Sequence, residues 1–306
     1  MLNQIAAIHG TGAAPAPAGV AGYFGSGNTS SAAIDKIAFP ADTKTTLAAT
    51  LTSPRSNLAG ASNVGVAGYS GGGYDGANNL NGIDKIAFPA DTKTTLAATL
   101  STAVRALGSM NNAGVAGYFA GGFDGSPRVA TVNKIAFPAD TKTTTTALST
   151  ARSDLSGMQN NGTAGYFGGG FDTVYLSQIL KYAFPSDTQT TLSATLTTAR
   201  SATAGFGNNS TAGYFAGGYN GSSNLSGIDK IAFPADTKTT LSATLSATRR
   251  AGSGMSNNGV AGYVGGGFEA AAVTTIDKIT FSSDARSTLS ATLSTAGVAP
   301  SGMQNA

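Results

Sequence analysis

The stretch Gly117–Arg152 reads GYFAGGFDGSPRVATVNKIAFPADTKTTTTALSTAR, and close copies of it make up almost the whole chain of 306 residues. The Gly-Tyr pair that opens each copy occurs six times, and successive copies are offset by 46 to 49 residues. The pairs begin at Gly22, Gly68, Gly117, Gly165, Gly213 and Gly262. Self-similarity at a period of about 20–50 residues is typical of solenoids, arrays and propellers. Because one such unit cannot bury a core by itself, the repeat predicts a single cooperative domain.

The composition fits a folded chain with few charges. Only 11% of the residues are charged and 42 are Gly, which is also seen in low-complexity segments. Here, however, Ile, Leu, Phe and Tyr recur at fixed offsets, which disordered Gly/Ser tracts do not show. The net charge of +3 is spread over the units without a basic run, so nucleic acid is not an expected partner. The chain has no Cys and therefore no disulfide or thiolate metal site.

The first half of each unit predicts two strands near a crowded axis. In the third unit a short segment, Ser109-Met110, ends at the turn signal Asn111-Asn112-Ala113-Gly114. The next segment, Val115–Gly122, is small except for Tyr118 and Phe119. Gly and Ala are poor strand formers, so their concentration here predicts close approach of backbones rather than strand propensity.

The second half of each unit predicts two more strands. Val132–Phe137 alternates apolar and polar residues, and Pro138 with Asp140-Thr141 then ends the strand in a turn. The fourth segment is clearest as Thr239–Leu245, where Thr, Ser and Leu alternate as in an edge strand with one wet face. Four short antiparallel strands per unit match a blade of a β-propeller.

The two ends of the chain favour a closed ring over a solenoid. A solenoid needs distinct polar caps at its ends. Instead, the first copy lacks its first segment, and the chain finishes with Ser301–Asn305, which matches Ser156–Asn160. We therefore predict an all-β, six-bladed propeller of four-stranded antiparallel blades over residues 19–306. Its C-terminal strand completes the first blade, and residues 1–18 form an arm outside the blades.

The order of features in each unit resembles a kelch repeat over about residues 19–305. A small-residue strand is followed by an aromatic strand ending in Gly-Gly (Gly121-Gly122), a strand running into an Asp-Thr turn, and a strand ending in Arg. Kelch units usually carry a Trp after the turn, whereas this chain has none. Leucines that can fill the gap between blades stand near that position: Leu47, Leu96, Leu192, Leu241 and Leu289.

Near-identical Gly/Ser/Thr-rich kelch-like units also resemble those of virion-associated proteins of phages that infect cyanobacteria and other marine bacteria. The resemblance implies a virion component that is assembled in the host cytoplasm, docks to other virion proteins through its N-terminal arm, and forms homo-oligomers within the larger assembly. No Lys or Arg precedes an apolar stretch near the N-terminus, and no apolar run is long enough to span a membrane. The alternative is a cytoplasmic or non-classically exported bacterial protein.

The sequence indicates no catalytic constellation and no cofactor. The single histidine, His9, lies in the arm, and one imidazole cannot build a His-based metal site or a catalytic triad. No loop carries the Asp-x-Asp-x-Asp-Gly pattern of a calcium site. We therefore expect that the chain is not an enzyme.

Two charged positions recur about once per unit. Each Arg either bridges neighbouring blades or caps strand ends, or else the arginines form a ring that lines a channel mouth and binds carboxylates or phosphates. Each Asp lies in the turn after Phe-Pro, or after Phe-Ser in the last copy, where we expect it to accept backbone N–H bonds. The arginines are Arg55, Arg105, Arg152, Arg200 and Arg249, and Gly297 replaces the sixth. The aspartates are Asp42, Asp91, Asp140, Asp187, Asp236 and Asp284.

The copies differ most in the loop after Gly-Gly. All six loops join equivalent strands, so they are expected to form one composite surface. An aromatic face beside Asp or Asn suits sugar recognition, because the ring covers the C–H face and the polar group bonds hydroxyls. Alternatively, each aromatic residue plugs the end of its own blade. The candidate binding residues are Tyr74, Asp75, Phe123, Asp124, Phe171, Asp172, Tyr219, Asn220, Phe268 and Glu269.

Together these features predict a non-enzymatic structural and recognition module. The favoured setting is a phage tail, fibre or capsid-associated protein that presents its loop face to a host-surface glycan or to a virion partner. The alternatives are a bacterial kelch-type lectin or protein-interaction adaptor and, with less support, a glycan-processing enzyme of kelch fold.

Overall fold

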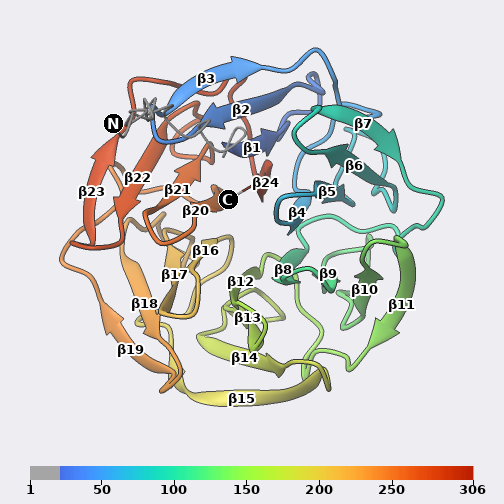
Figure 1. Ribbon diagram of the computed structural model, residues 1–306. Coiled ribbons are helices and arrows are strands. Elements are labelled where there is room, and N and C mark those ends of the chain that lie inside the picture. The colour runs from blue at the N-terminus through green and yellow to red at the C-terminus, as the bar shows by residue number, and fades with distance from the viewer. Residues whose placement is uncertain (1–20, 306) are drawn as a thin grey trace, which may run out of the picture.

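A computed structural model describes residues 21–305 of the chain, and the predicted arm and His9 lie outside this part. The described chain is all-β, with six four-stranded antiparallel sheets arranged as blades around one axis (Figure 1). The predicted six-bladed propeller is thereby confirmed. Within the described residues, no helix has the length and apolar character needed to cross a membrane.

The strands of each blade follow one another outward from the axis. Blade 1 contains β24 (Ser301–Gln304), β1 (Ala21–Gly25), β2 (Ile34–Ala38) and β3 (Thr43–Thr46). Blade 2 contains β4 (Ala59–Asn63), β5 (Ala67–Gly71), β6 (Ile83–Ala87) and β7 (Thr92–Thr95). Blade 3 contains β8 (Gly108–Asn112), β9 (Ala116–Ala120), β10 (Val132–Ala136) and β11 (Thr141–Thr145).

The second half of the ring has the same order. Blade 4 contains β12 (Ser156–Asn160), β13 (Ala164–Gly168), β14 (Gln178–Ala183) and β15 (Thr188–Thr195). Blade 5 contains β16 (Ala204–Asn208), β17 (Ala212–Ala216), β18 (Ile228–Ala232) and β19 (Thr237–Thr240). Blade 6 contains β20 (Ser253–Asn257), β21 (Ala261–Gly265), β22 (Ile276–Thr280) and β23 (Ala285–Thr288).

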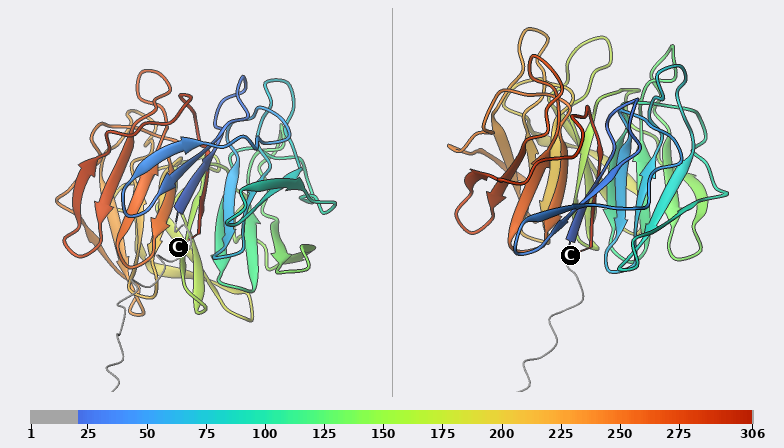
Figure 2. Two further views of the ribbon diagram at one scale, coloured as in Figure 1. Left: turned by 45° about the horizontal axis from the view of Figure 1, so that its top comes forward. Right: turned by 90° about the horizontal axis from the view of Figure 1, so that it is seen from above.

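The C-terminal strand closes the ring as predicted. β24 pairs antiparallel with β1, and Met303 lies opposite Tyr23. Met303 is buried together with Tyr23 and with Ile86 of blade 2, so the closing strand contributes to the hydrophobic core as well as to the sheet. Figure 2 shows the disc from the side, with the C-terminal end on the face opposite the projecting loops.

Small residues line the axis because the inner strands almost touch. A Cβ atom added to Gly254 would overlap the carbonyl of Gly205, and one added to Gly302 would overlap the carbonyl of Gly254. Close backbone approach was predicted for the second segment of each unit, but it occurs at these first strands; within the second strands, a Cβ on Gly117 would meet the side chains of Ala61 and Phe137, and one on Gly165 would meet that of Met110.

The hydrophobic core is divided into six clusters, each between two neighbouring blades. In all six, the tyrosine of a second strand stacks on the phenylalanine that directly follows the third strand of the next blade, as Tyr118 does on Phe184 at 5.4 Å. The five leucines that stand near the kelch Trp position, Leu47, Leu96, Leu192, Leu241 and Leu289, pack partly buried against these clusters.

The recurring turn aspartate joins blades, which corrects the expectation that it caps its own turn. Asp187 accepts a hydrogen bond of 2.7 Å from Tyr118 Oη and an ion-pair contact of 2.6 Å from Lys134 Nζ, both in the preceding blade. Its backbone adopts φ 55°, a left-handed conformation that Asp tolerates better than most residues. The turn thereby aims the carboxylate at the neighbouring blade.

The fourth strand is shorter than predicted. Instead of Thr239–Leu245, β19 covers Thr237–Thr240. After Thr240 the chain turns inward, where Leu241 N donates to Ile228 O and Leu245 becomes buried. Burial of the leucine therefore prevails over the alternating strand pattern.

Candidate functional site

The loops after the second strands form one face of the disc, and glycine sets their geometry. In blade 3, Gly121 and Gly122 adopt φ 64° and 112°, and a Cβ on Gly122 would lie 2.9 Å from the Arg105 carbonyl oxygen. The chain therefore turns so closely that Phe123 forms backbone bridges with both Arg105 and Arg128. Each aromatic loop residue is held at the top of its blade in this way.

Aromatic rings and guanidinium groups alternate along this loop face. Arg105 Cζ lies 4.8 Å from the ring centre of Tyr74 and 5.0 Å from that of Phe123. Arg128 Cζ lies 4.4 Å from the ring centre of Phe171 and 6.0 Å from that of Phe123. These contacts connect blades 2, 3 and 4.

The same arc continues over blades 4, 5 and 6. Tyr175 packs against Phe171 at 4.8 Å and against Tyr219 at 5.7 Å. Arg250 Cζ then lies 4.9 Å from the ring centre of Tyr219 and 4.7 Å from that of Phe268. All five aromatic candidates therefore belong to one continuous arc, which we call the aromatic–arginine arc. Blade 1 has no aromatic residue in its loop and leaves the arc open.

The acidic and amide candidates mainly shape their own loops. Asp75 Oδ1 accepts backbone hydrogen bonds of 2.8 and 2.7 Å from its own loop, and these bonds hold the pKa of Asp75 below its usual value. Asp124 and Asn220 accept equivalent bonds. Tyr74 Oη and Tyr219 Oη also donate to carbonyls of their own loops. Asp172 and Glu269 occupy the corresponding half-buried positions in blades 4 and 6.

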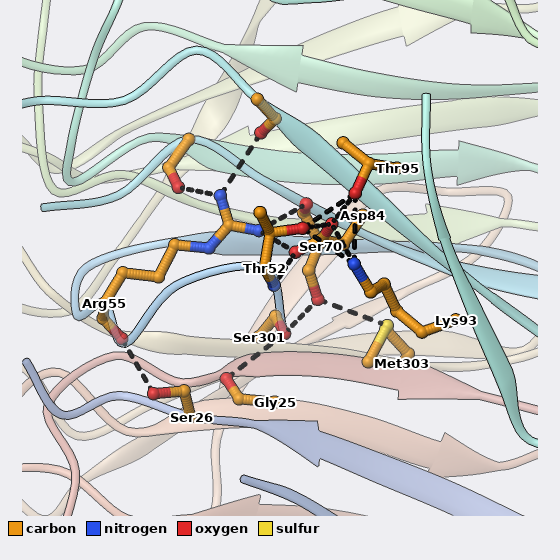
Figure 3. Close-up of polar contacts among 12 residues, drawn as sticks. Gly25, Ser26, Thr52, Arg55, Ser70, Asp84, Lys93, Thr95, Ser301 and Met303 are labelled. Carbon is orange, nitrogen blue, oxygen red and sulfur yellow. Dashed lines mark hydrogen bonds and ion pairs between the residues drawn. The ribbon is translucent and has the colours of Figure 1, made fainter. Parts of the chain in front are cut away.

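Most of the predicted arginine ring is buried inside the blades. Arg55 Nη2 lies 2.8 Å from Asp84 Oδ2, with the two side chains 3% and 1% exposed, and Thr52 donates two further bonds to the same carboxylate (Figure 3). Equivalent pairs are Arg200–Asp229 at 2.9 Å and Arg249–Asp277 at 2.7 Å, and Arg152 instead donates to Gln178 Oε1 at 3.0 Å. None of these arginines lines the channel, so the channel-mouth hypothesis is wrong for Arg55, Arg152, Arg200 and Arg249.

Arg105 belongs to a different position from the other four. Its neighbour Val104 is buried at the position where four other blades carry the buried Arg. The Val104 carbonyl accepts a hydrogen bond from Gly73 N, as the carbonyls of the buried arginines do from equivalent glycines. The aspartate partner is replaced in the same blade by Asn133, which accepts bonds from Ser101. Arg and Asp are thus exchanged together for two neutral residues, which leaves Arg105 on the loop face.

A ring of backbone hydrogen bonds surrounds the axis at the loop face. One residue from each blade takes part. Five of the six backbone N–H groups each donate to the backbone carbonyl of the equivalent residue in the preceding blade, at 2.6 to 2.8 Å. All six residues have positive φ. The ring consists of Asn57, Ala106, Asp154, Ala202, Ala251 and Ala299. Below it, a central channel of about 100 Å³ is lined by small and amide side chains of the inner strands.

Asp154 is the one carboxylate in this ring. Ser153 Oγ donates to it at 2.7 Å. Burial in the narrow channel raises the pKa of Asp154 above its usual value, against the opposing effects of the Ser153 bond and of the positive charges of Arg128, Arg105 and Arg250. Three guanidinium groups of the loop face therefore lie within electrostatic reach of the channel mouth.

The sequence reading missed several residues of the arc. Arg128, Tyr175 and Arg250 were not among the candidates, nor were Asn79 and Asn224, which contact two of the arginines. The available signal was the register: Arg105 and Arg250 each follow the position of the buried arginine by one residue. Because both positions carry Arg in the sixth blade, residue type alone does not distinguish them.

Comparison with known proteins supports the fold. No protein-family model matches the chain, and no curated protein matches it at a significant level. Among solved structures 329 chains match, so the scaffold is widely shared and does not by itself identify a function. The structure described as "Structure of YjhT" has a TM-score of 0.72 and 15% sequence identity, and the match covers 90% of this chain and 98% of that chain. At this identity the likeness shows the propeller fold alone.

The described chain offers no preformed metal centre. In residues 21–305, no group of three or more His, Cys, Asp or Glu side chains could hold a metal ion. The propeller fold is consistent with a non-catalytic interaction or recognition module, and its distinctive feature is the aromatic–arginine arc.

Proposed function

We propose that this chain is a non-enzymatic recognition module that binds a saccharide through the aromatic–arginine arc. The observation that carries the proposal is the arc itself: five aromatic residues from five blades lie in one continuous series in the loops where the copies differ most in sequence. Aromatic rings stack on the C–H faces of sugars, and rigid blades hold the rings in place at little entropic cost.

The proposed setting is a phage virion, in a tail, fibre or capsid-associated position. This part rests on the resemblance of the near-identical kelch-like units to those of virion-associated phage proteins. A closed disc with six inter-blade cores suits the rigid display of a binding face. Electron microscopy of phage particles labelled with an antibody against this chain tests the setting, and labelling of host cells alone would favour a bacterial lectin or adaptor.

Glycan-array binding tests the recognition proposal. We expect the protein to bind a subset of surface glycans, and we expect the triple variant Tyr74→Ala, Phe123→Ala, Tyr219→Ala to lose that binding. The matched control is Val115→Ser, because Val115 is 48% exposed in a turn on the opposite face of the disc. Equal binding by the wild type and the triple variant, or no binding by either, contradicts the proposal. Release of sugar from a bound glycan would instead indicate a glycan-processing enzyme.

A further inference from the structure

The loop face carries one four-residue arrangement twice, on opposite sides of the propeller axis. In each copy an arginine lies between two aromatic rings and beside an asparagine. Corresponding residues are offset by 145 positions, which is three of the six blades and therefore half a turn around the axis. The two sets are Tyr74, Asn79, Arg105 and Phe123, and Tyr219, Asn224, Arg250 and Phe268.

The two copies agree closely in geometry. Arg105 Nη1 lies 3.4 Å from Asn79 Oδ1, and Arg250 Nη1 lies 3.3 Å from Asn224 Oδ1. Each asparagine Nδ2 in turn donates to the carbonyl of the aromatic residue in the next blade, at 3.1 Å in both copies. The two ring centres lie 4.7 to 5.0 Å from the Cζ atom of each guanidinium group. Its Nε and Nη2 groups have no protein acceptor in the described chain, so its edge is available to a ligand.

These arginines differ from most other cations in residues 21–305, which have an acidic partner within ion-pair distance. The third-strand lysines are all paired with turn aspartates at 2.6 to 2.7 Å, and three buried arginines are paired with third-strand aspartates. Within residues 21–305, Arg105, Arg128 and Arg250 have no acidic partner within ion-pair distance. A planar guanidinium edge without a partner is suited to bidentate binding of a carboxylate.

The acidic residues on the same face limit which anions can bind. Asp75, Asp124, Asp172 and Glu269 each follow an aromatic residue of the arc. They are expected to repel a ligand with closely spaced negative charges. A saccharide whose carboxylates are separated by neutral sugars avoids this repulsion, because the neutral sugars can lie over the aromatic rings.

We propose that the loop face holds two related subsites, centred on Arg105 and Arg250, each of which takes one carboxylate of a saccharide whose uronic acids alternate with neutral sugars. This assignment rests on the proposed recognition function and specifies its ligand class. The asparagine and the two rings fix the guanidinium edge, and a carboxylate oxygen pair completes its hydrogen bonds.

The two subsites differ in one neighbour. Arg128 forms a backbone bridge with Phe123 in blade 3, and Ala272 occupies the equivalent position beside Phe268 in blade 6. The Arg128 guanidinium has ring contacts and no hydrogen-bond partner. The blade 3 subsite therefore binds a carboxylate more tightly than the blade 6 subsite.

Titration calorimetry with a hyaluronan tetrasaccharide, in which glucuronate alternates with N-acetylglucosamine, tests the proposal. We expect two sites per chain, of which Arg105→Gln and Arg250→Gln each remove one, with affinity falling at least about tenfold at the altered site. Arg128→Ala weakens the tighter site alone. Arg105→Lys, which keeps the charge and loses the planar fork, also weakens it. The matched control is Arg286→Gln, because Arg286 lies on the outer strand β23 and bonds Thr288 and Thr244. Thermal unfolding of each variant verifies that it is folded.

Several outcomes overturn the assignment. It is wrong if the methyl ester of the tetrasaccharide binds as tightly as the acid, if heparin binds more tightly than the tetrasaccharide, or if the Arg105→Gln, Arg250→Gln double variant still binds two molecules. It is also wrong if the tetrasaccharide does not bind at all. In each case, the recognition function is still supported if neutral sugars on the glycan array bind in a way that depends on Tyr74, Phe123 and Tyr219. If no glycan on the array binds, both proposals are wrong.

Discussion

Tyr118 Oη in blade 3 donates a hydrogen bond of 2.7 Å to Asp187 Oδ1 in blade 4, across 69 residues of sequence. The other oxygen of the same carboxylate receives Lys134 Nζ at 2.6 Å. Equivalent bonds join every pair of neighbouring blades, including the pair at the closure: Tyr23–Asp91, Tyr69–Asp140, Tyr166–Asp236, Tyr214–Asp284 and Tyr263–Asp42. A charged hydrogen bond at the edge of each inter-blade core thus holds the ring in register.

Replacement of Tyr118 by Phe removes this bond and leaves the ring packing intact. We expect a loss of about 1–2 kcal/mol in the free energy of unfolding, because the acceptor is a carboxylate that is largely buried. Tyr214→Phe should cost less, since its bond to Asp284 is 3.0 Å long and the Asp284 side chain is 27% exposed. Urea unfolding measures both. Tyr74→Phe is the control, because its hydroxyl bonds only its own loop; an equal loss there would contradict the role of the inter-blade bond.

Alkaline pH should destabilise the fold. Burial, followed by the hydrogen bond and the charge of the partner aspartate, raises the pKa of Tyr118 far above its usual value, and the same causes act on its counterparts in the other blades. Above pH about 10 the unfolded chain releases tyrosine protons that the folded chain keeps, so stability falls as pH rises. The melting temperature should therefore drop between about pH 10 and 11.5. The gap in stability between the wild type and Tyr118→Phe should narrow over this range, and a constant gap would contradict the assignment.

The repeat and the closure of the ring could be predicted because short stretches of sequence are enough to recognise them. Ser301–Asn305 is identical in sequence to Ser156–Asn160, and the first copy lacks the strand that this stretch forms in the other copies. The role of the turn aspartate could not be predicted, because it depends on residues that are distant in sequence. Its partners, such as Tyr118 and Lys134 for Asp187, lie more than 50 residues away, so no local pattern reveals the pairing.

The candidate site was predicted in part. The five loop aromatics lie together because their position after Gly-Gly is fixed by the fold. The arginines of the arc could not be identified by residue type, since Arg249 is buried against Asp277 and the adjacent Arg250 stacks between Tyr219 and Phe268. Which of two neighbouring arginines faces the solvent depends on register, and only the backbone bridges of the structure settle it.

The neutral pair Val104 and Asn133 in blade 3 indicates which residues can replace the buried Arg–Asp pairs of the other blades. Arg249 and Asp277 are fully buried, so Arg249→Val alone leaves an unpaired buried carboxylate and should cost about 3–5 kcal/mol. Asp277→Asn alone should also destabilise, because it leaves the guanidinium unpaired. The double variant reproduces Val104 and Asn133, and the new Asn can still accept the bond from Ser246 as Asn133 does from Ser101.

We therefore expect the double variant to cost clearly less than the sum of the two single variants, with a coupling energy of at least about 1 kcal/mol. A double-mutant cycle measured by urea unfolding provides this quantity. The pair Arg200 and Asp229 offers a second cycle in blade 5, at nearly the same burial. Additive costs in both cycles would show that the paired exchange in blade 3 has no energetic basis.

The strength of the closure can be measured by a comparison within the chain. Met303 of β24 and Met158 of β12 occupy equivalent positions, both are buried, and each packs against a glycine of the neighbouring blade. If the closing strand is held as firmly as a strand that is continuous with its own blade, Met303→Ala and Met158→Ala should each cost about 2–5 kcal/mol. A much smaller cost at Met303 would mean that β24 detaches before the rest of the ring unfolds. Native-state hydrogen exchange distinguishes the two cases, because early detachment exposes the β24-bonded amides of β1 while those of β13 stay protected.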